Sequence, residues 1–439
     1  MPRFTPIETA PVPERAILVG VDTGRSEWPL EESLAELGRL AETDGAVVVG
    51  TLTQRLDSPV PRTFIGSGKV EEVVRLVNAL EADVVIFDDE LTPSQQANLE
   101  KAVKEPVKVI DRTALILDIF GNHAKTRDGR LQVQLAQLQY LLPRLRGMWS
   151  HLVGEQTRGG IGSRFGQGES QLEVDRRMVR DRIATLRREL ETLERRRGVQ
   201  SKARWDAGIY RVALVGYTNA GKSTLLNHLT GSEVYARDEL FATLDPTTRA
   251  LDLEEGRKIT LTDTVGFIQK LPTTLVEAFK STLAEVVAAD LILHVVDAND
   301  PNADKEIRTV NSVLADIGAS DKRSVLVFNK VDLLDDAHRR TLELSYPGCV
   351  CISALDGTGL RGLLYRIAQE ASEGDVTMSV LIPYDKGMLI RMVHERCQMI
   401  SERYEDGGLL ATLRASERMS MTLEPYRVEP EESDLDADA

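Results

Sequence analysis

An eight-residue run, Gly216-Tyr217-Thr218-Asn219-Ala220-Gly221-Lys222-Ser223, sets the architecture of this chain. Residues 211–215 before it are predicted to be a buried strand and residues 224–229 after it a helix, the context in which Gly-x4-Gly-Lys-Ser indicates a phosphate-binding loop. Glycines let the backbone approach phosphates, and N–H groups at a helix start face negative charge. The run therefore predicts nucleoside triphosphate binding, with Lys222 at the β- and γ-phosphates and Ser223 on Mg²⁺.

The base-reading residues are predicted to follow a second strand. Residues 295–297 and 324–328 resemble buried parallel strands, and Asn329-Lys330-Val331-Asp332 comes directly after the latter. The Asp332 carboxylate can accept both guanine N1–H and the exocyclic amine, whereas adenine offers no such donor pair. Asn329 and Lys330 would brace the loop and cover the base. A capped turn is the alternative reading of this tetrapeptide.

A second phosphate-sensing segment, Asp263-Thr264-Val265-Gly266, follows a predicted strand at 258–262. Asp263 would hold Mg²⁺ through water and the Gly266 N–H would sense the γ-phosphate. With Lys222, these two residues are the candidate catalytic group, together with a threonine upstream.

That threonine lies in Phe241-Ala242-Thr243-Leu244-Asp245-Pro246-Thr247-Thr248, which is predicted to form the first switch loop. A hydroxyl suits the hard Mg²⁺ ion, but the residues alone do not choose among Thr243, Thr247 and Thr248. Ser353-Ala354-Leu355, after a predicted strand at 350–352, would support the base. These ordered segments predict an α/β guanine-nucleotide switch.

Phe267 stands where many small switches carry a glutamine that orients water. An apolar ring cannot do so, and we expect slow hydrolysis that a partner accelerates. The alternative is that Phe267 merely packs beneath the switch.

The composition predicts a cytoplasmic protein of several domains. The chain has 439 residues, 42% of them hydrophobic and 28% charged, and three cysteines, which give no disulfide framework or metal cluster. No apolar run reaches the ~20 residues of a membrane span, and residues 1–13 contain no signal segment. We expect a monomer.

The charge is unevenly distributed. The net charge is −15, yet residues 123–211 contain 19 Lys/Arg against 10 Asp/Glu. A basic middle in an acidic chain favours a local surface for a polyanion. Arginines crowd the predicted helix at 171–197, whose apolar stripe would pack on a helix at 131–145. A solvated helix face is the alternative, but an excess that is nearly all arginine suits phosphate recognition.

The connection between these helices, residues 154–169, holds six glycines and two arginines. Arg158 and Arg164 could pair with phosphates, and Phe165 could stack on an unpaired base. Together with Arg176 and Arg177, they are the candidate RNA-binding residues.

We expect four regions: an α/β domain at 1–122, the basic hairpin at 123–207, the P-loop domain at 208–372 and a small α+β domain with an acidic tail at 373–439. The N-terminal domain should alternate four strands (16–21, 46–51, 83–87, 107–110) with helices (31–42, 70–80, 93–103, 113–119), which favours a parallel sheet. Gly66-Ser67-Gly68-Lys69 resembles a truncated phosphate loop, although a turn is the more ordinary reading. In the last region we expect strands at 376–382 and 409–428 and a helix at 386–403.

Taken together, the motifs resemble the HflX family of ribosome-associated GTPases over residues 15–372. The matching runs are Arg-Gly-Gly-Ile-Gly…Gly-x-Gly-Glu before Asp175-Arg176-Arg177, Gly-Tyr-Thr-Asn-Ala-Gly-Lys-Ser, Phe-Ala-Thr-Leu-Asp-Pro-Thr-Thr-Arg and Asp-Thr-Val-Gly-Phe-Ile. The resemblance implies a cytosolic GTPase that binds the large ribosomal subunit and its RNA and splits stalled or stress-damaged ribosomes. It implies that the hairpin loop enters near the peptidyl-transferase region, and that Ser223 and Thr243 hold Mg²⁺.

One residue departs from the family pattern. Members usually carry Gly-Pro-Gly-Glu, whereas this chain has Gly166-Gln167-Gly168-Glu169, which loosens the turn. Two other functions remain: a GTPase acting on another structured RNA or in subunit assembly, and a nucleotide-controlled protein scaffold. A small-molecule kinase is disfavoured because Asp332 selects guanine.

Overall fold

The computed structural model describes residues 13–145, 167–206, 209–231, 240–241, 243–253, 257–270, 272, 275 and 280–428. The chain divides into two compact units. The N-terminal unit contains Met1–Glu191 and two later segments, Glu239–Phe241 and Gln269–Phe279. The C-terminal unit contains Thr192–Asp238, Ala242–Ile268 and Lys280–Ala439. Two segments from the middle of the sequence therefore belong to the N-terminal unit.

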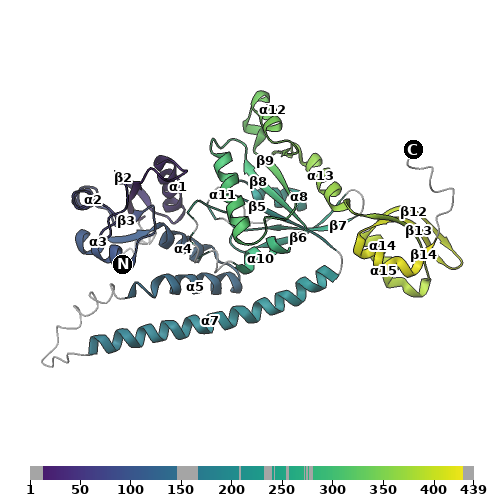
Figure 1. The fold of residues 1–439 in the computed structure, drawn as a ribbon, viewed down its shortest axis with the longest axis horizontal. Helices are drawn as coiled ribbons and strands as arrows, with labels where there is room; N and C mark the ends of the chain where they lie inside the picture. Colours follow the sequence, from purple (N-terminus) through teal and green to yellow (C-terminus); the bar gives the residue numbers. More distant parts are fainter. Residues whose placement is uncertain are drawn as a thin grey trace, which may run out of the picture. The chain divides into compact units, whose positions relative to one another are not determined.

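The N-terminal unit is built on a parallel sheet of four strands in the order β2-β1-β3-β4. Figure 1 labels two of them, β2 and β3, together with the helices α1 to α4. Its elements follow the predicted alternation: β1 (Arg15–Asp22), α1 (Leu30–Thr43), β2 (Val47–Arg55), α2 (Ser67–Leu80), β3 (Val84–Phe87), α3 (Pro93–Val103), β4 (Lys108–Asp111) and α4 (Arg112–His123). All four residues of β3 are buried, as the apolar run predicted. The parallel α/β prediction is confirmed.

Local signals explain where two of these helices begin. Thr92 caps α3 in a capping box with Gln95, and Pro93 occupies the first turn, where its missing N–H costs nothing. Asp111 caps α4 by accepting from the Ala114 N–H at 2.9 Å. Gly66 precedes α2, and the ammonium of Lys69 pairs with Glu72 at 2.7 Å, so this truncated glycine motif forms an ordinary helix start.

The basic hairpin consists of α5 (Arg127–Leu141) and the 40-residue α7 (Gln167–Asp206). Arg127 pairs with Glu189 at 3.6 Å, and Arg182 donates to Gln134 at 3.0 Å, so the two helices run antiparallel, side by side (Figure 1). The predicted hairpin is thus confirmed. Along α7, the described side chains of Ile183 and Leu186 are buried, whereas Met178 of the predicted apolar stripe is 63% exposed.

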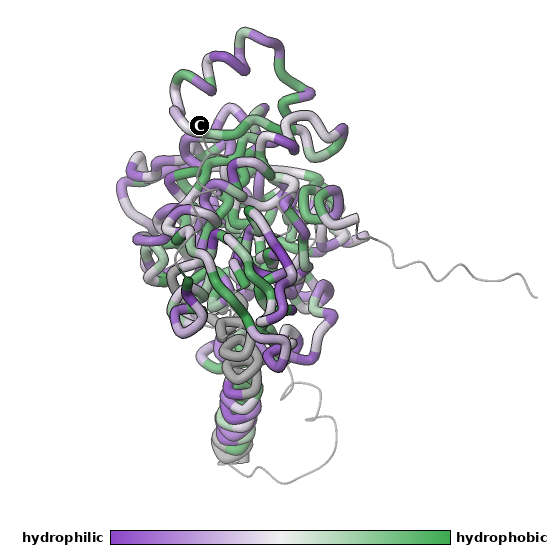
Figure 2. The backbone as a smooth tube through the Cα atoms, turned by 90° about the vertical axis from the view of Figure 1, so that its right-hand side faces the viewer, coloured by the Kyte–Doolittle hydropathy of each residue, from purple (hydrophilic) through white to green (hydrophobic). Residues whose placement is uncertain are grey.

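The C-terminal unit contains a six-stranded sheet in the order β10-β9-β8-β5-β7-β6. Its elements are β5 (Tyr210–Gly216), α8 (Lys222–Thr230), β6 (Thr247–Asp252), β7 (Lys258–Asp263), α10 (Lys280–Ala288), β8 (Leu291–Asp297), α11 (Ala303–Asp316), β9 (Ser324–Asn329), η1 (Val331–Leu333), α12 (Asp336–Ser345), β10 (Val350–Cys351) and α13 (Leu360–Ser372). The predicted strands are all present. In Figure 2 hydrophobic stretches gather inside the molecule, while the coloured part of the long helix at the bottom of the view carries many hydrophilic residues.

One strand of this sheet was not predicted. Thr247 and Thr248 were assigned to a loop, but they begin β6, which pairs antiparallel with β7 at the edge of the sheet. Thr248 Oγ1 lies 2.9 Å from Thr262 Oγ1 on the neighbouring strand. The prediction failed because this edge strand is half-exposed and has no long apolar run.

The last region is an antiparallel sheet in the order β12-β13-β11-β14. Its elements are β11 (Val376–Ile382), η2 (Tyr384–Lys386), α14 (Gly387–Arg396), β12 (Gln398–Glu405), β13 (Gly408–Ala415), α15 (Glu417–Leu423), η3 (Glu424–Tyr426) and β14 (Arg427–Val428). The predicted helix at 386–403 is wrong beyond Arg396, because residues 398–405 pair with β13. The predicted strand at 409–428 is likewise interrupted by α15. Among the described residues, no helix is both long and apolar enough to cross a membrane.

Candidate functional site

The loop between β5 and α8 is shaped by glycines that no other residue could replace without displacing neighbours. Gly216 has φ +153°, and a Cβ there would lie 2.1 Å from the Val295 carbonyl oxygen. Gly221 has φ +90°, and a Cβ there would lie 2.2 Å from Asn329 Nδ2. The backbone therefore takes a path open only to glycine, with the start of α8 facing the space above it.

Lys222 is buried inside this loop. Its Nζ donates to the carbonyl oxygens of Gly216 at 3.1 Å and Tyr217 at 2.7 Å. Burial lowers the pKa of Lys222 to about 8, although the Asp263 carboxylate acts in the opposite direction. A cation held this way, without a close carboxylate hydrogen bond in the described residues, is well placed for an anionic ligand.

Three oxygen-bearing side chains meet beside Lys222. Ser223 Oγ lies 2.7 Å from Thr243 Oγ1 and donates to Asp263 Oδ2 at 2.6 Å. The other oxygen of Asp263, Oδ1, is buried and has no hydrogen-bond partner among the described residues. Burial raises the pKa of this carboxyl, against the effect of Lys222. Two hydroxyls and a carboxylate with an unused oxygen are the donors that Mg²⁺ prefers, so these residues fit that ion.

Of the three candidate threonines, the structure brings Thr243 to Ser223 and leaves Thr247 and Thr248 in β6. The adjacent predicted residues divide between the two units. Leu244 is buried and Asp245 half-buried, while Phe241 belongs to the N-terminal unit, where its ring packs on Phe120 with centroids 4.6 Å apart. Ala242 lies outside the described residues.

The segment after Asp263 lies against the phosphate loop. Thr264 Oγ1 donates to the Leu214 carbonyl at 2.7 Å. At Gly266 a Cβ would come within 2.8 Å of the Thr218 side chain and 3.2 Å of Lys222 Nζ, so this position has no room for a side chain. Val265 is buried. Gly266 therefore lies directly beside the groups predicted to hold the phosphates.

Phe267 is 1% exposed. Its N–H donates to the Gly216 carbonyl at 3.1 Å, and its carbonyl accepts from the Thr218 N–H at 2.8 Å. The ring thus packs inside the fold, as the alternative reading of this residue proposed, and it carries no group that could orient water.

The base-reading segment is joined to the phosphate loop by one amide. Asn329 Nδ2 donates to the Ala220 carbonyl at 2.8 Å, and its Oδ1 accepts from the Ala354 N–H at 2.9 Å. These are the two contacts that a bracing residue between the loops would make. Lys330 adopts φ +65° and pairs with Asp297 at 2.7 Å.

Asp332 lies in the short η1 helix with its side chain exposed, and Val331 beside it is buried. Ser353 is fully buried, whereas Leu355 is 78% exposed. Asn329 is thus bonded to the predicted segment 353–355, and the Asp332 carboxylate is open to a ligand.

The predicted RNA-binding residues are only partly described. Arg158, Arg164 and Phe165 lie outside the described residues. Arg176 and Arg177 lie on α7, where Arg176 is half-buried and Arg177 exposed.

Sequence reasoning missed two residues near the site. His294 lies in the buried strand β8, and its Nε2 has no partner among the described residues. Burial and the nearby Lys222 lower the pKa of His294 to about 4, which keeps the ring neutral beside a cation. The signal was a lone histidine within an apolar strand. Asp297, the partner of Lys330, was signalled only by its position at the end of that strand.

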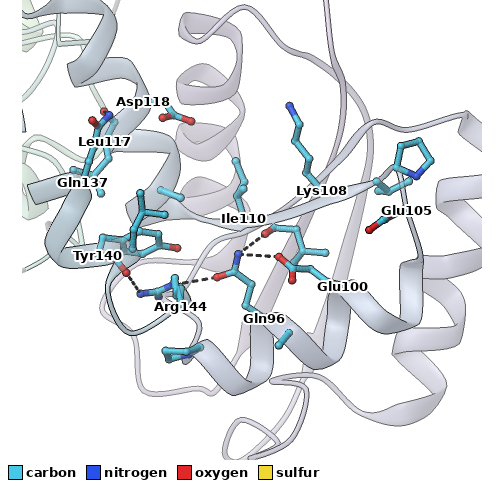
Figure 3. Close-up of a pocket in the computed structure, with 17 residues that line it drawn as sticks. Gln96, Glu100, Glu105, Lys108, Ile110, Leu117, Asp118, Gln137, Tyr140 and Arg144 are labelled. Carbon is cyan, nitrogen blue, oxygen red and sulfur yellow. Dashed lines mark hydrogen bonds between the residues drawn. The ribbon is translucent and has the colours of Figure 1, made fainter. Parts of the chain in front are cut away.

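A separate cavity of about 740 Å³ lies in the N-terminal unit, between α3, β4, α4 and α5 (Figure 3). Its innermost cation, Arg144, donates to Gln96 Oε1 at 3.1 Å, to the Tyr140 carbonyl at 3.0 Å and to the Leu91 carbonyl at 2.6 Å. Because these oxygens of the protein already take up its N–H groups, Arg144 does not resemble a phosphate ligand.

Comparisons with known proteins agree with this geometry. Three family patterns match in order: "GTP-binding GTPase N-terminal" at residues 31–121, "GTP-binding GTPase Middle Region" at 123–204 and "50S ribosome-binding GTPase" at 211–330. GTPase HflX of Caldanaerobacter subterraneus subsp. tengcongensis is 48% identical over 396 residues, 90% of this chain and 90% of that protein. GTPase HflX of Escherichia coli is 43% identical over 388 residues, 87% of this chain and 89% of that protein.

Among solved structures, a GTP-binding protein from the hyperthermophilic archaeon Sulfolobus solfataricus in complex with GDP is 25% identical, with a TM-score of 0.42. The match covers 82% of this chain and 99% of that one.

Proposed function

This chain belongs to the HflX family of GTPases, and from that membership we propose that its GTP-bound form binds the large ribosomal subunit and separates stalled or stress-damaged ribosomes. The chain is a GTPase. The observation that carries the ribosomal part of the proposal is the arginine face of α7, on a hairpin in the same chain as a complete nucleotide site.

We propose the following roles at the nucleotide. The loop from Gly216 to Ser223 wraps the phosphates, and Lys222 neutralises the β- and γ-phosphates. Asp332 selects guanine by accepting two N–H bonds, while Asn329 keeps the base loop and the phosphate loop at a fixed separation. The Gly266 N–H contacts the γ-phosphate and so distinguishes GTP from GDP.

Ser223 and Thr243 would hold Mg²⁺ directly and Asp263 through water. When bound, the ion neutralises charge on the phosphates during transfer. The support is the oxygen set described above, in particular the unpartnered Oδ1 of Asp263.

We propose that hydrolysis is slow until a partner supplies the missing group. The support is Phe267, whose buried ring replaces the side chain that would orient the attacking water. Ribosomes are the proposed partner. Fast hydrolysis by the purified chain alone would contradict this.

Most of the exposed, described arginines of α7 lie on one side of the helix. At about 100° per residue, five of them fall within about one third of the circumference, whereas Arg182 lies outside it and the buried side chains of Ile183 and Leu186 point elsewhere. These five are Arg177, Arg180, Arg187, Arg188 and Arg195. An arginine row of this kind suits contacts with successive phosphates of folded RNA. We propose that this face, with Arg158, Arg164, Phe165 and Arg176, is the RNA contact.

The decisive experiment is sedimentation of intact ribosomes with the full chain in GTP, a non-hydrolysable analogue or GDP. We expect free subunits in GTP and the analogue, with the protein on the large subunit, and intact ribosomes in GDP. Ribosomes that stay joined while the protein binds would leave a GTPase acting on assembling subunits or another RNA. No salt-dependent binding to either subunit would favour a protein partner.

Alanine replacements in the hairpin loop separate ribosome binding from nucleotide binding. Arg158→Ala with Arg164→Ala should weaken ribosome binding by about tenfold and reduce its salt dependence, because phosphate contacts are lost. Nucleotide affinity should not change. Equal loss of both activities would mean that this loop supports the GTPase fold.

A further inference from the structure

The N-terminal sheet has a crevice of the kind in which α/β domains bind ligands. The chain runs from β1 outward to β2 and then back to β3 on the other side of β1, so the strand order reverses between β1 and β3. Loops diverge at the carboxyl ends of the strands at such a point, and ligands commonly bind there. Asp88 and Asp89 follow β3 at this end, and Arg112 follows β4. The residues that line this crevice show what occupies it.

The centre of the crevice is a buried group of charges. Asp88 is fully buried, and its Oδ1 accepts from Arg112 Nη2 at 2.6 Å. Arg112 is also buried and donates to Glu36 Oε1 at 2.6 Å. The remaining oxygen of Asp88, Oδ2, accepts from Ser33 Oγ at 2.7 Å. One arginine facing two carboxylates leaves a negative charge that requires another cation.

That cation is Lys270, which is 182 residues away in sequence from Asp88. Lys270 Nζ lies 2.5 Å from Asp88 Oδ2 and 2.6 Å from Asp89 Oδ1. Burial raises the pKa of Asp88, but Arg112 and Lys270 outweigh it, and the pKa lies below its usual value. The lysine side chain is 30% exposed while Asp88 is 0% exposed, so Lys270 is the member of the group that can leave.

The backbone of Lys270 is held in place as firmly as its side chain. Its φ is +52°, a left-handed conformation that side-chain-bearing residues adopt only where their surroundings hold them. The preceding carbonyl, that of Gln269, lies 3.5 Å from Arg112 Nη1. Backbone and side chain of this segment are thus both fixed in the N-terminal unit.

The same segment begins beside the predicted phosphate loop. Gly266 lies four residues before Lys270 and has no room for a side chain beside Thr218 and Lys222. Four residues span at most about 14 Å, so a large movement of Gly266 would pull Lys270 away from its partners.

The first switch is also attached to the N-terminal unit a few residues from its predicted nucleotide-facing group. Phe241, two residues before Thr243, is 2% exposed and packs edge-on against Phe120 of the N-terminal unit at an interplanar angle of 81°. Each switch therefore has an anchor in the N-terminal unit a few residues from its nucleotide-facing group.

We infer that the crevice of the N-terminal sheet is a binding site for Lys270, and that Lys270 is a positioning residue for GTP hydrolysis. Its contacts with Asp88 and Asp89 occur in a structure where Thr243 reaches Ser223, the arrangement that suits Mg²⁺ and GTP. Because Lys270 follows Gly266 by only four residues, seating Lys270 restricts where Gly266 can lie. By thermodynamic reciprocity, GTP bound at Gly266 then favours seating Lys270.

The test uses the full chain without ribosomes, so that it can fail independently of the ribosomal proposal. Lys270→Ala should weaken binding of a non-hydrolysable GTP analogue by about tenfold and change GDP binding by less than about twofold, and single-turnover hydrolysis should slow. Lys270→Arg keeps the charge and should restore most of the discrimination. Lys108→Ala is the matched control, because it removes an ion pair with Glu14 at the opposite end of the same sheet; it should leave both affinities unchanged.

A structural role alone predicts a different pattern. If Lys270→Ala lowers the melting temperature while the ratio of the two affinities stays within about twofold, the inference is wrong. Should this variant fail to fold, Asp89→Asn removes one of the two contacts at a position outside the buried centre, and about threefold loss of discrimination is expected. Unchanged discrimination in that variant, with hydrogen exchange near Asp88 equal in GTP and GDP, would overturn it equally.

Discussion

The four-stranded N-terminal sheet and the six-stranded sheet of the C-terminal unit differ in what fills the crevice beside them. At the six-stranded sheet, the buried oxygens Thr218 Oγ1 and Asp263 Oδ1 have no hydrogen-bond partner within the described residues. At the N-terminal sheet, the buried charges of Arg112, Asp88 and Glu36 bond to one another. Buried polar groups are almost always paired, so an unpaired set marks a place built for something that binds. The crevice at the six-stranded sheet is suited to a ligand from solution, whereas the crevice at the N-terminal sheet is filled by the chain itself.

The largest effect should come from breaking the self-filled crevice. Arg112→Met would leave two buried carboxylates without their cation, and we expect a loss of about 3–5 kcal/mol in the stability of the N-terminal sheet. Hydrogen exchange in β1 and β3 measures this. Arg391→Ala, which removes an exposed pair with Glu395 on a helix surface, should leave exchange unchanged. A loss under about 1 kcal/mol would mean that the paired charges of this crevice are not structural.

The open crevice should respond in binding rather than in stability. Lys222→Ala removes the cation facing the phosphates, and GTP affinity should fall by about 3 kcal/mol, more than a hundredfold. Fluorescence titration measures the affinity, and thermal unfolding without nucleotide should change little. If Lys222→Ala lowered the melting temperature but left GTP affinity unchanged, Lys222 would serve stability rather than binding, contrary to this comparison.

A smaller change should alter which ligand the open crevice prefers. Asp332→Asn loses one acceptor for guanine and should weaken GTP binding by about 2 kcal/mol, roughly thirtyfold, while xanthosine triphosphate binds better. Competition between the two nucleotides reports the exchange. Unchanged GTP preference would remove Asp332 from the site.

The smallest effect is a pH dependence. Burial lowers the pKa of Lys222 to about 8 in the free protein, and bound phosphates would raise it again. Lys222 is charged at pH 7, so affinity is full there; above about pH 8 binding must take up a proton, and affinity should fall by up to tenfold per pH unit. Titrations between pH 7 and 9 measure the slope. In Lys222→Arg the guanidinium stays charged, so the slope should vanish; a slope that persists would assign it to another group.

The sequence predicted the open crevice far better than the filled one. Short sequence patterns alone predict the parts of the open crevice: the phosphate loop, Asp263, Gly266 and the base-reading run. The position of Asn329 after β9 and the antiparallel pairing of the hairpin helices also followed from local patterns. Thr243 could not be chosen from the residues, because its distance from Ser223 depends on how the chain returns to the loop.

The failures share a physical cause. The helix predicted through residue 403 ends at Arg396 because β12 gains more from pairing with β13 than from continuing the helix. The strand β6 and the pair between Lys270 and Asp88 also depend on distant partners. No local pattern around Asp88 shows that its counter-charge lies 182 residues ahead.

That separation has a consequence for how the protein is made. Synthesis at roughly 5–20 residues per second puts about 9–36 s between the appearance of Asp88 and that of Lys270. During this interval the nascent N-terminal sheet holds a buried carboxylate with one of its cations missing. We expect the crevice of this sheet to be filled only after the second switch has been translated, so that a chain stopped before Lys270 carries a first domain whose crevice is still open.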